Sequence, residues 1–137
     1  MGKIITYLTF NGNCKEAMTF YKNCLGGELH LQTVGESPLS DKLPLEMKNY
    51  ILQAVLKNQN FSLMGTDMVE GNGLSKGNAV SMFISCKNES EMRRFFLKLS
   101  NKGQITHEVA PTYWGALFGS LVDQFGHHWL LQCPNLP

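Results

Sequence analysis

The 137-residue sequence lacks most features that mark secreted, membrane-bound or metal-stapled proteins. Its four cysteines form no C-x-x-C pair, and no group of cysteine and histidine residues has zinc spacing. Free thiols in a reducing compartment are therefore the simplest interpretation. The sequence also has no secretory-signal pattern and no apolar run of membrane-spanning length. We expect a cytoplasmic protein without a membrane partner.

Charge is scarce as well. Charged residues make up 17% of the chain, the formal net charge is +1, and there is no long basic run. Bulk electrostatics thus gives no reason to expect nucleic acid as a partner. Hydrophobic residues make up 43%, and a chain of this length buries roughly two-thirds of its unfolded surface, enough for a core. We predict a single domain covering residues 1–137.

What the sequence does contain is a repeat at an offset of 75 residues. Asn13 and Asn88 are both followed three residues later by glutamate, as in a capping box that begins a helix. Apolar positions then recur at i, i+3, i+4 and i+7, which places them on one helix face. Ala17, Phe20, Tyr21 and Cys24 in the first copy match Met92, Phe95, Phe96 and Leu99 in the second. Gly26, Gly27 and Gly103 lie where the helices should end. The repeat predicts two equivalent helices.

Segments rich in β-branched and aromatic residues surround each predicted helix. Residues 4–10 and 80–85 precede the helices; residues 28–34, 50–57 and 61–66 follow the first, and 104–110, 114–122 and 128–133 follow the second. The pattern predicts an α+β protein of two tandem βαβββ modules, at about 3–67 and 79–134, with a linker at about 68–78. Residues 35–45, with two prolines, form an additional loop whose role the sequence leaves open.

An ordered set of short motifs resembles the PhnB-like branch of the vicinal-oxygen-chelate (glyoxalase/bleomycin-resistance/dioxygenase) superfamily. The motifs are residues 7–13, Glu16-Ala17, Phe20-Tyr21, Leu25-Gly26-Gly27-Glu28, Leu63-Met64 with Asp67, Trp114-Gly115, Gly119, Asp123, Phe125-Gly126 and Trp129. The resemblance implies a glyoxalase-like fold, in which each module is a curled mixed sheet with one helix packed outside. It also implies homodimers.

In metal-using members of that superfamily, histidine and glutamate or glutamine side chains from the first and last strands of each module hold a divalent ion. Carried over to this sequence, those places fall near Ile5, Ser62, Val80 and Leu130. Aliphatic side chains cannot ligate, and serine is a poor ligand for the usual ions. We therefore expect no cofactor and no metal at the usual positions.

A displaced divalent-metal site is the less favoured alternative. His128 and Gln132 lie two residues on either side of Leu130, so strand alternation puts all three on one face. If that face points inward, His128 could ligate a metal or act as a general base. The competing interpretation is that His128 is simply part of the polar start of a strand. Beyond this candidate, the sequence identifies no catalytic residue.

Aromatic residues are the more informative candidates for a binding site. Tyr7, Tyr50, Trp114, Phe118 and Trp129 lie on predicted strands, and together with Gln132 they are candidates to line a cavity with few polar groups. For each aromatic residue the alternative is an ordinary place in the core.

These observations support three functional hypotheses. The favoured one is a protein that binds a small molecule in the module cavity without the usual metal. The alternatives are an enzyme (lyase, isomerase, dioxygenase or thiol transferase) with a displaced metal near His128, and a dimeric structural or interaction protein. Relatives in the PhnB-like branch are sometimes labelled as ubiquinone-pathway methyltransferases. Because no nucleotide-type glycine loop is present to hold a methyl donor, methyl transfer is not predicted.

Overall fold

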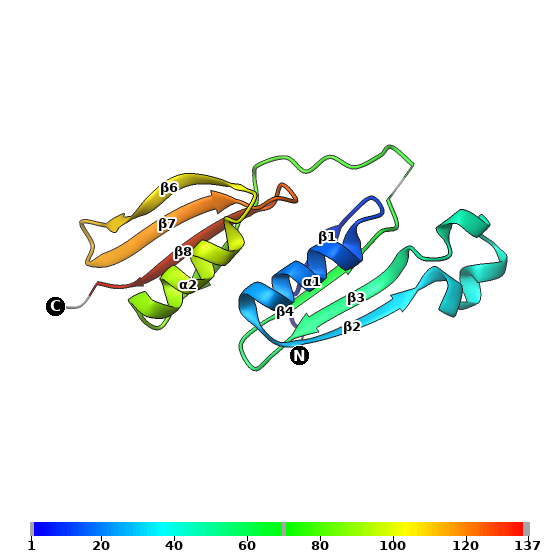
Figure 1. Ribbon diagram of the computed structural model, residues 1–137, viewed down its shortest axis with the longest axis horizontal. Helices are drawn as coiled ribbons and strands as arrows, with labels where there is room; N and C mark the ends of the chain where they lie inside the picture. Colours follow the sequence, from blue (N-terminus) through cyan, green and yellow to red (C-terminus); the bar gives the residue numbers. More distant parts are fainter. Residues whose placement is uncertain (1, 70, 136–137) are drawn as a thin grey trace. The chain divides into compact units, whose positions relative to one another are not determined.

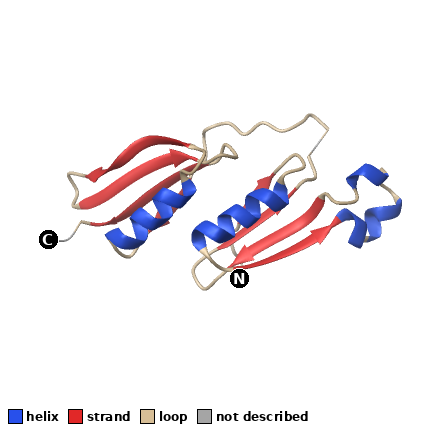
Figure 2. Cartoon of the chain, viewed as in Figure 1, coloured by secondary structure: helices blue, strands red, loops and turns tan. Residues whose placement is uncertain are grey.

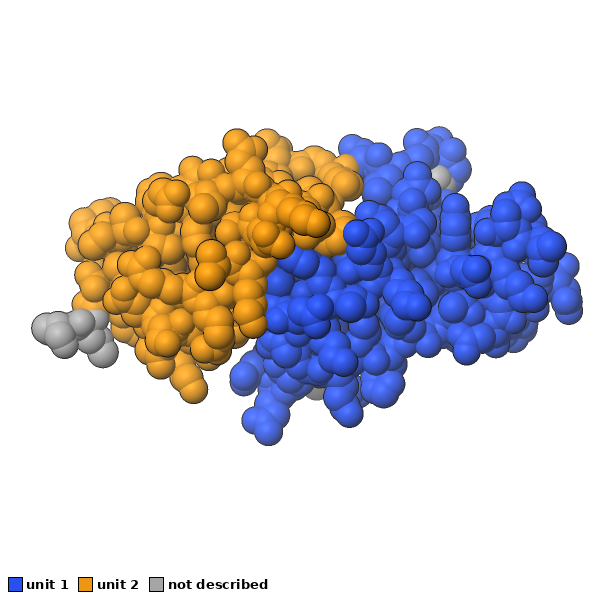
Figure 3. Space-filling model, viewed as in Figure 1, with its two compact units in different colours: residues 1–75 blue, residues 76–137 orange. Residues whose placement is uncertain are grey.

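The computed structural model describes residues 2–69 and 71–135, and it divides into two compact units, residues 1–75 and 76–137 (Figure 3). Each unit contains one βαβββ module, so the predicted α+β fold with two such modules is confirmed. The division falls between Ser75 and Lys76, inside the segment that the sequence predicted as a linker.

Unit 1 is built from β1 (Thr6–Thr9), α1 (Cys14–Leu25), β2 (Glu28–Thr33), β3 (Ile51–Lys57) and β4 (Ser62–Thr66). The strands form one sheet in the order β1-β4-β3-β2, with α1 across one of its faces (Figures 1 and 2). β1 runs parallel to β4, and the other pairs are antiparallel. The predicted loop between β2 and β3 contains three short 3-10 helices: η1 (Val34–Glu36), η2 (Pro38–Asp41) and η3 (Leu45–Met47).

Unit 2 repeats this arrangement with β5 (Met82–Ser85), α2 (Glu89–Leu99), β6 (Gln104–Pro111), β7 (Ala116–Val122) and β8 (His128–Pro134). Its sheet has the order β5-β8-β7-β6, again with one parallel pair, β5 with β8. Five of the predicted strands begin one or two residues later than expected, and this affects two candidate site residues. Tyr50 lies just before β3, and Trp114 lies in the turn before β7.

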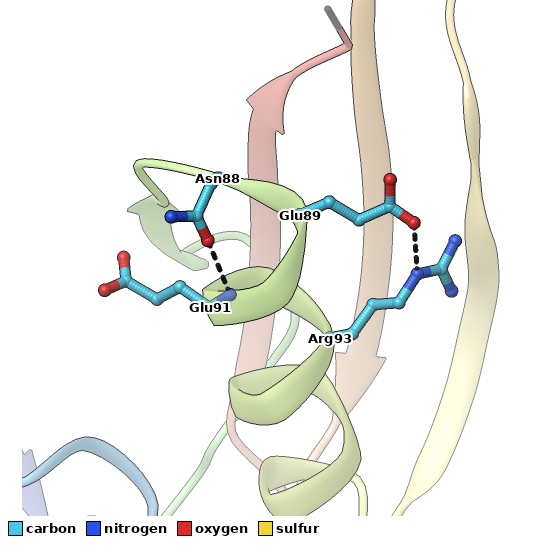
Figure 4. Close-up of polar contacts among 4 residues, drawn as sticks. All are labelled: Asn88, Glu89, Glu91 and Arg93. Atoms are coloured by element: carbon cyan, nitrogen blue, oxygen red, sulfur yellow. Dashed lines mark hydrogen bonds and ion pairs between the residues drawn. The ribbon is translucent and has the colours of Figure 1, made fainter.

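The two helices begin differently, although the repeat predicted the same cap for both. At α2 the Oδ1 atom of Asn88 accepts a hydrogen bond from the backbone N–H of Glu91 at 2.8 Å (Figure 4). At α1 the side chain of Asn13 makes no capping bond, so that part of the prediction is wrong. The carboxylate of Asp67 accepts from the N–H of Cys14 at 2.9 Å instead. A buried acidic side chain from the end of β4 therefore replaces the local cap.

The core of each unit lies between the helix and one face of the sheet, as the apolar periodicity predicted. The buried residues of α1 are Cys14, Ala17, Met18, Tyr21 and Cys24, and those of α2 are Met92, Phe96 and Leu99. Glycines allow close approach of helix and sheet. A Cβ at Gly65 would lie 3.1 Å from the sulfur of Cys14, and one at Gly119 would lie 2.8 Å from the ring of Phe96. The faces turned away from the helices are consequently the ones available to a ligand.

Candidate functional site

We call the face of each sheet that points away from its helix the open face. In unit 1, one row of paired residues crosses all four strands on this face: Tyr7 with Met64, Met64 with Val55, and Val55 with His30. The tyrosine is 52% exposed. Strand alternation sends the neighbouring side chains, such as buried Leu63, toward the helix. The open face of unit 1 thus presents an aromatic ring at one edge and an imidazole at the other.

Unit 2 carries a corresponding row. Phe83 pairs with Leu130, Leu130 with Ser120, and Ser120 with His107. Phe83 is 53% exposed, close to the exposure of its counterpart Tyr7. Both units therefore place a half-exposed aromatic residue on the first strand and a histidine on the outermost strand. The offset of 75 in the helices did not reveal this match, because each loop length differs between the two copies.

The strand pairing also shows which residue of unit 2 corresponds to the carried-over ligand place at Ser62 in unit 1. Met64 and Leu130 occupy the same position in their rows, so Ser62 corresponds to His128, two residues earlier in each strand. Ile5 and Val80 precede β1 and β5, at 36% and 79% exposure. The aliphatic side chains at three of the four carried-over places do not fit a divalent ion.

His128 lies with Leu130 and Gln132 on the open face of β8, while Trp129, Leu131 and Cys133 between them are buried. The cross-strand partner of His128 is Val122, which offers no ligand. In the described part of the chain, residues 2–69 and 71–135, no group of three or more His, Cys, Asp or Glu side chains is placed to hold a metal ion. His128 therefore belongs to no such group among these residues.

Three of the predicted pocket residues come together in unit 2. The indole Nε1 of Trp114 donates to Oε1 of Gln132 at 3.2 Å, and Gln132 is paired across the strands with Phe118. The ring of Phe118 in turn lies 5.4 Å from the imidazole of His107, edge to face. Tyr113, which the sequence analysis did not single out, packs against Trp114 at 4.9 Å and is 97% exposed.

The three other predicted pocket residues lie elsewhere. Trp129 is only 2% exposed, on the helix-facing side of β8, and its Nε1 donates to Oδ2 of Asp123 at 2.8 Å. It belongs to the core of unit 2, and its separation of three residues from Gln132 already implied opposite faces of one strand. Tyr50 is half-buried beside Gly12, whose added Cβ would lie 3.7 Å from the tyrosine hydroxyl. Tyr7 lies on the open face of unit 1.

The buried carboxylates are satisfied by structural contacts. Asp67 is 3% exposed and binds backbone N–H groups of Gly12, Cys14 and Ile51. Asp123 is equally buried, and its Oδ1 accepts from the N–H of Phe125 at 2.8 Å, which closes the turn between β7 and β8. Both carboxylates therefore have structural roles: Asp67 accepts from backbone N–H groups, and Asp123 accepts from backbone N–H groups and the indole of Trp129.

The titratable groups near these carboxylates are held in their neutral forms. Burial raises the pKa of the Cys14 thiol to about 12, and the Asp67 carboxylate acts in the same direction. Burial also lowers the pKa of His127, with the opposing attraction of Asp123 and a further lowering by Lys76 and His128. A thiol with a raised pKa is a poor nucleophile, so Cys14 does not have the character of an activated catalytic thiol.

None of the described helices has the length and apolarity needed to cross a bilayer.

Comparison with known proteins gives a consistent result over nearly the whole chain. A family model described as 3-demethylubiquinone-9 3-methyltransferase matches residues 2–132. The protein YjdN of Escherichia coli K12 is 28% identical over 133 residues, covering 91% of this chain and 90% of YjdN. The crystal structure of PA1353 from Pseudomonas aeruginosa has a TM-score of 0.86 at 32% identity and covers 98% of both chains.

The match extends to a Bacillus cereus structure described as a putative 3-demethylubiquinone-9 3-methyltransferase, PhnB protein. It has a TM-score of 0.77 at 26% identity and covers 96% of this chain and 99% of that one. Structures described as glyoxalase-related or glyoxalase/bleomycin resistance proteins match at TM-scores of 0.62 to 0.64 with 8% to 14% identity. The likeness to these glyoxalase-like structures concerns the fold alone.

Proposed function

The chain belongs to the family described as 3-demethylubiquinone-9 3-methyltransferase, within the PhnB-like branch of the vicinal-oxygen-chelate superfamily, and we propose that it binds a small organic molecule on the open faces of its modules. The usual metal of the superfamily takes no part. In superfamily members that hold it, the ion acts as a Lewis acid on substrate oxygens. At three of the four carried-over places, Ile5, Val80 and Leu130, the aliphatic side chains do not fit such an ion.

The exposed aromatic residues of the open faces carry this proposal. Tyr7, Phe83 and Trp114 are 52%, 53% and 55% exposed, although burial of such large side chains is strongly favourable. Neighbouring open-face residues such as Met64 and Leu130 extend the apolar surface in both units. Exposed apolar patches with a few polar groups are typical of ligand-binding surfaces.

A thermal-shift experiment on chelator-stripped protein tests the proposal. We expect no saturable stabilisation with Zn²⁺, Ni²⁺, Mn²⁺, Mg²⁺ or Fe²⁺, and a saturable rise in Tm with members of a library of uncharged aromatic and aliphatic compounds. A ligand at about 100 times its Kd should add roughly 2.7 kcal/mol to the free energy of unfolding. A metal-induced rise that disappears in His128→Ala would favour the displaced metal site instead. A library in which no compound stabilises the protein would count against small-molecule binding.

Methyl transfer is not part of the proposal, despite the description of the family. The glycines at 71, 73 and 77 lie in the exposed segment before β5 and lead into a strand, whereas a phosphate-binding glycine loop leads into a helix. Incubation with a labelled methyl donor and a demethylated quinone precursor should give no labelled product. Transfer above the rate of a heat-denatured control would contradict this expectation.

We also propose that the protein is a cytoplasmic homodimer. β1 pairs only with β4, and β5 only with β8, so within the described residues each sheet has an edge strand with free backbone groups. Such edges favour pairing with another chain. The four described cysteines are free thiols, which suits a reducing compartment. Light scattering at micromolar concentration should give twice the chain mass of 15.4 kDa; a monomer mass would refute the dimer.

A further inference from the structure

Unit 2 contains a series of residues, linked by two ring contacts, one side-chain hydrogen bond and one cross-strand pair, that we call the aromatic line: Tyr113, Trp114, Gln132, Phe118 and His107. The rings of Tyr113 and Trp114 are 4.9 Å apart, and Trp114 donates to Gln132 at 3.2 Å. Gln132 pairs with Phe118, whose ring lies 5.4 Å from that of His107. The line therefore runs from the turn before β7 across the open face to β6.

The hydrogen bond from Trp114 decides which end of the Gln132 amide a ligand meets. An indole N–H can only donate, so Gln132 accepts through its oxygen. The amide NH₂ group is then the end of the side chain that remains for a ligand, and its hydrogens can only be donated. The side chain that carries this donor is bonded to the half-exposed indole of Trp114, and its residue is paired across the strands with Phe118. The geometry suits a ligand with a flat ring and an adjacent acceptor oxygen.

Charge on the open faces narrows the ligand class further. The open-face positions of β5, β7 and β8 hold no Asp, Glu, Lys or Arg; they are Phe83, Ser85, Ala116, Phe118, Ser120, Val122, His128, Leu130, Gln132 and Pro134. On the open face of unit 1, by contrast, Glu28 is paired with Lys57. An ionised ligand on the aromatic line would lose hydration without meeting a fixed opposite charge on these strands. The ligand group expected there is uncharged.

We propose that the aromatic line is a subsite for a flat, uncharged aromatic group that carries a carbonyl oxygen. The ring stacks on Trp114, and the carbonyl oxygen accepts a hydrogen bond from the Gln132 amide. This inference rests on the proposed small-molecule function and assigns it to one unit and one ligand class. Trp114 and Gln132 act in it as ligand-contacting residues, and Phe118 supplies apolar surface beside them.

Nitrogen–proton correlation spectra of the labelled full-length protein, titrated with naphthamide, test the inference directly. The chain has two tryptophans, and their indole N–H signals report opposite faces of the same sheet. The signal of Trp114 and the side-chain amide signals of Gln132 should move saturably. The signal of Trp129, whose N–H is buried against Asp123, should stay unchanged. Cyclohexanecarboxamide, which has the carbonyl but no flat ring, should bind at least fivefold more weakly, as a stacking contribution of about 1 kcal/mol requires.

Two variants test the contribution of the Trp114 ring and that of the Gln132 amide donor separately. Trp114→Ala should weaken naphthamide binding about fivefold or more. Gln132→Glu keeps an oxygen to accept from Trp114 but removes the NH₂ donor, so the Trp114 signal should persist while naphthamide affinity falls about fivefold or more. Leu97→Ala is the matched control, because Leu97 is 74% exposed on α2, on the other side of the sheet. The affinity of this variant for naphthamide should equal that of the unsubstituted protein.

The outcomes distinguish this subsite from the broader function. If naphthamide moves signals of unit 1 residues but not those of Trp114 and Gln132, the subsite is refuted while small-molecule binding stands. If Gln132→Glu binds naphthamide as tightly as the unsubstituted protein, the carbonyl contact is refuted. If neither naphthamide nor any compound of the thermal-shift library binds, the subsite and the proposed function both fail.

Discussion

Replacement of Asp67 by asparagine should reveal how strongly one buried carboxylate holds unit 1 together. Oδ1 of Asp67 accepts from the N–H groups of Gly12 and Cys14, each at 2.9 Å, and Oδ2 accepts from that of Ile51 at 2.8 Å. These three bonds join the end of β4 to the start of α1 and the start of β3. In Asp67→Asn the amide oxygen can keep two of them, but the NH₂ group then faces the N–H of Ile51, donor against donor.

The expected magnitude follows from these contacts. A hydrogen bond to a charged group contributes about 1.5–3 kcal/mol, and a buried donor left without a partner costs about 1–3 kcal/mol. Loss of the Ile51 bond, with two weakened bonds to a now neutral group, should lower the free energy of unfolding by roughly 3 kcal/mol. With an m-value of about 1.5–2 kcal/mol/M, the urea midpoint of unit 1 should fall by roughly 1.5–2 M.

Urea unfolding followed by two probes measures this effect. Both tryptophans, Trp114 and Trp129, lie in unit 2, so their fluorescence reports unit 2, whereas far-ultraviolet circular dichroism reports both units. The dichroism transition of Asp67→Asn should begin at lower urea. Asn13→Ala, which removes no capping bond, should change stability by less than about 0.5 kcal/mol, while Asn88→Ala should cost about 1 kcal/mol. The reasoning is wrong if Asp67→Asn costs under about 1 kcal/mol, or if the two asparagine variants cost the same.

Two further predictions concern pH and thiol reactivity. Burial lowers the pKa of His127 below its ordinary 6.5; Asp123 opposes this effect, and Lys76 and His128 add to it. The imidazole therefore binds a proton more tightly in the unfolded chain than in the folded one. The free energy of unfolding should therefore fall as pH is lowered from above 6.5 through the folded-state pKa, and His127→Gln should flatten this part of the profile; an identical profile in the variant would contradict it. Because Cys14 and Cys86 are buried with pKa values raised to about 12, the native protein should react slowly with a chromogenic disulfide reagent at pH near 8 and rapidly in urea; rapid labelling of the native protein would show that these thiols are open to solvent.

Much of the fold was predictable because it depends on local patterns. The apolar spacing predicted the buried faces of both helices, although Phe20 and Phe95 are only half-buried. Gly26 ends α1 as expected, with a φ of 82° that favours glycine. The cap of α1 was not predictable from local sequence, since the carboxylate of Asp67 comes from 53 residues away along the chain. Sequence rules for caps consider only the side chains next to the helix, so they assigned the role to Asn13.

The candidate site was only partly predictable, for a related reason. Alternation placed His128, Leu130 and Gln132 on one face, and the same rule applied to Trp129 would have removed it from the pocket candidates. The contact between Trp114 and Gln132 joins a turn to the strand beyond β7. The match of His30 with His107 also required the strand register, because a bulge in β6 changes the spacing. The spacing of residues along the sequence reveals neither the contact between Trp114 and Gln132 nor the strand register.

The order of strands in each sheet has a consequence for synthesis on the ribosome. β4 lies between β1 and β3, and β8 lies between β5 and β7, so in each unit the strand made last occupies an inner position. Until β4 has emerged, β1 has no hydrogen-bonded neighbour, and only the hairpin of β2 and β3 can pair. Asp67 follows β4 directly and accepts hydrogen bonds from the N–H groups of Gly12 and Cys14 at the start of α1. These bonds can therefore form only once the last strand of the sheet has been made. Neither half of the nascent chain can therefore complete its sheet before its last strand has emerged.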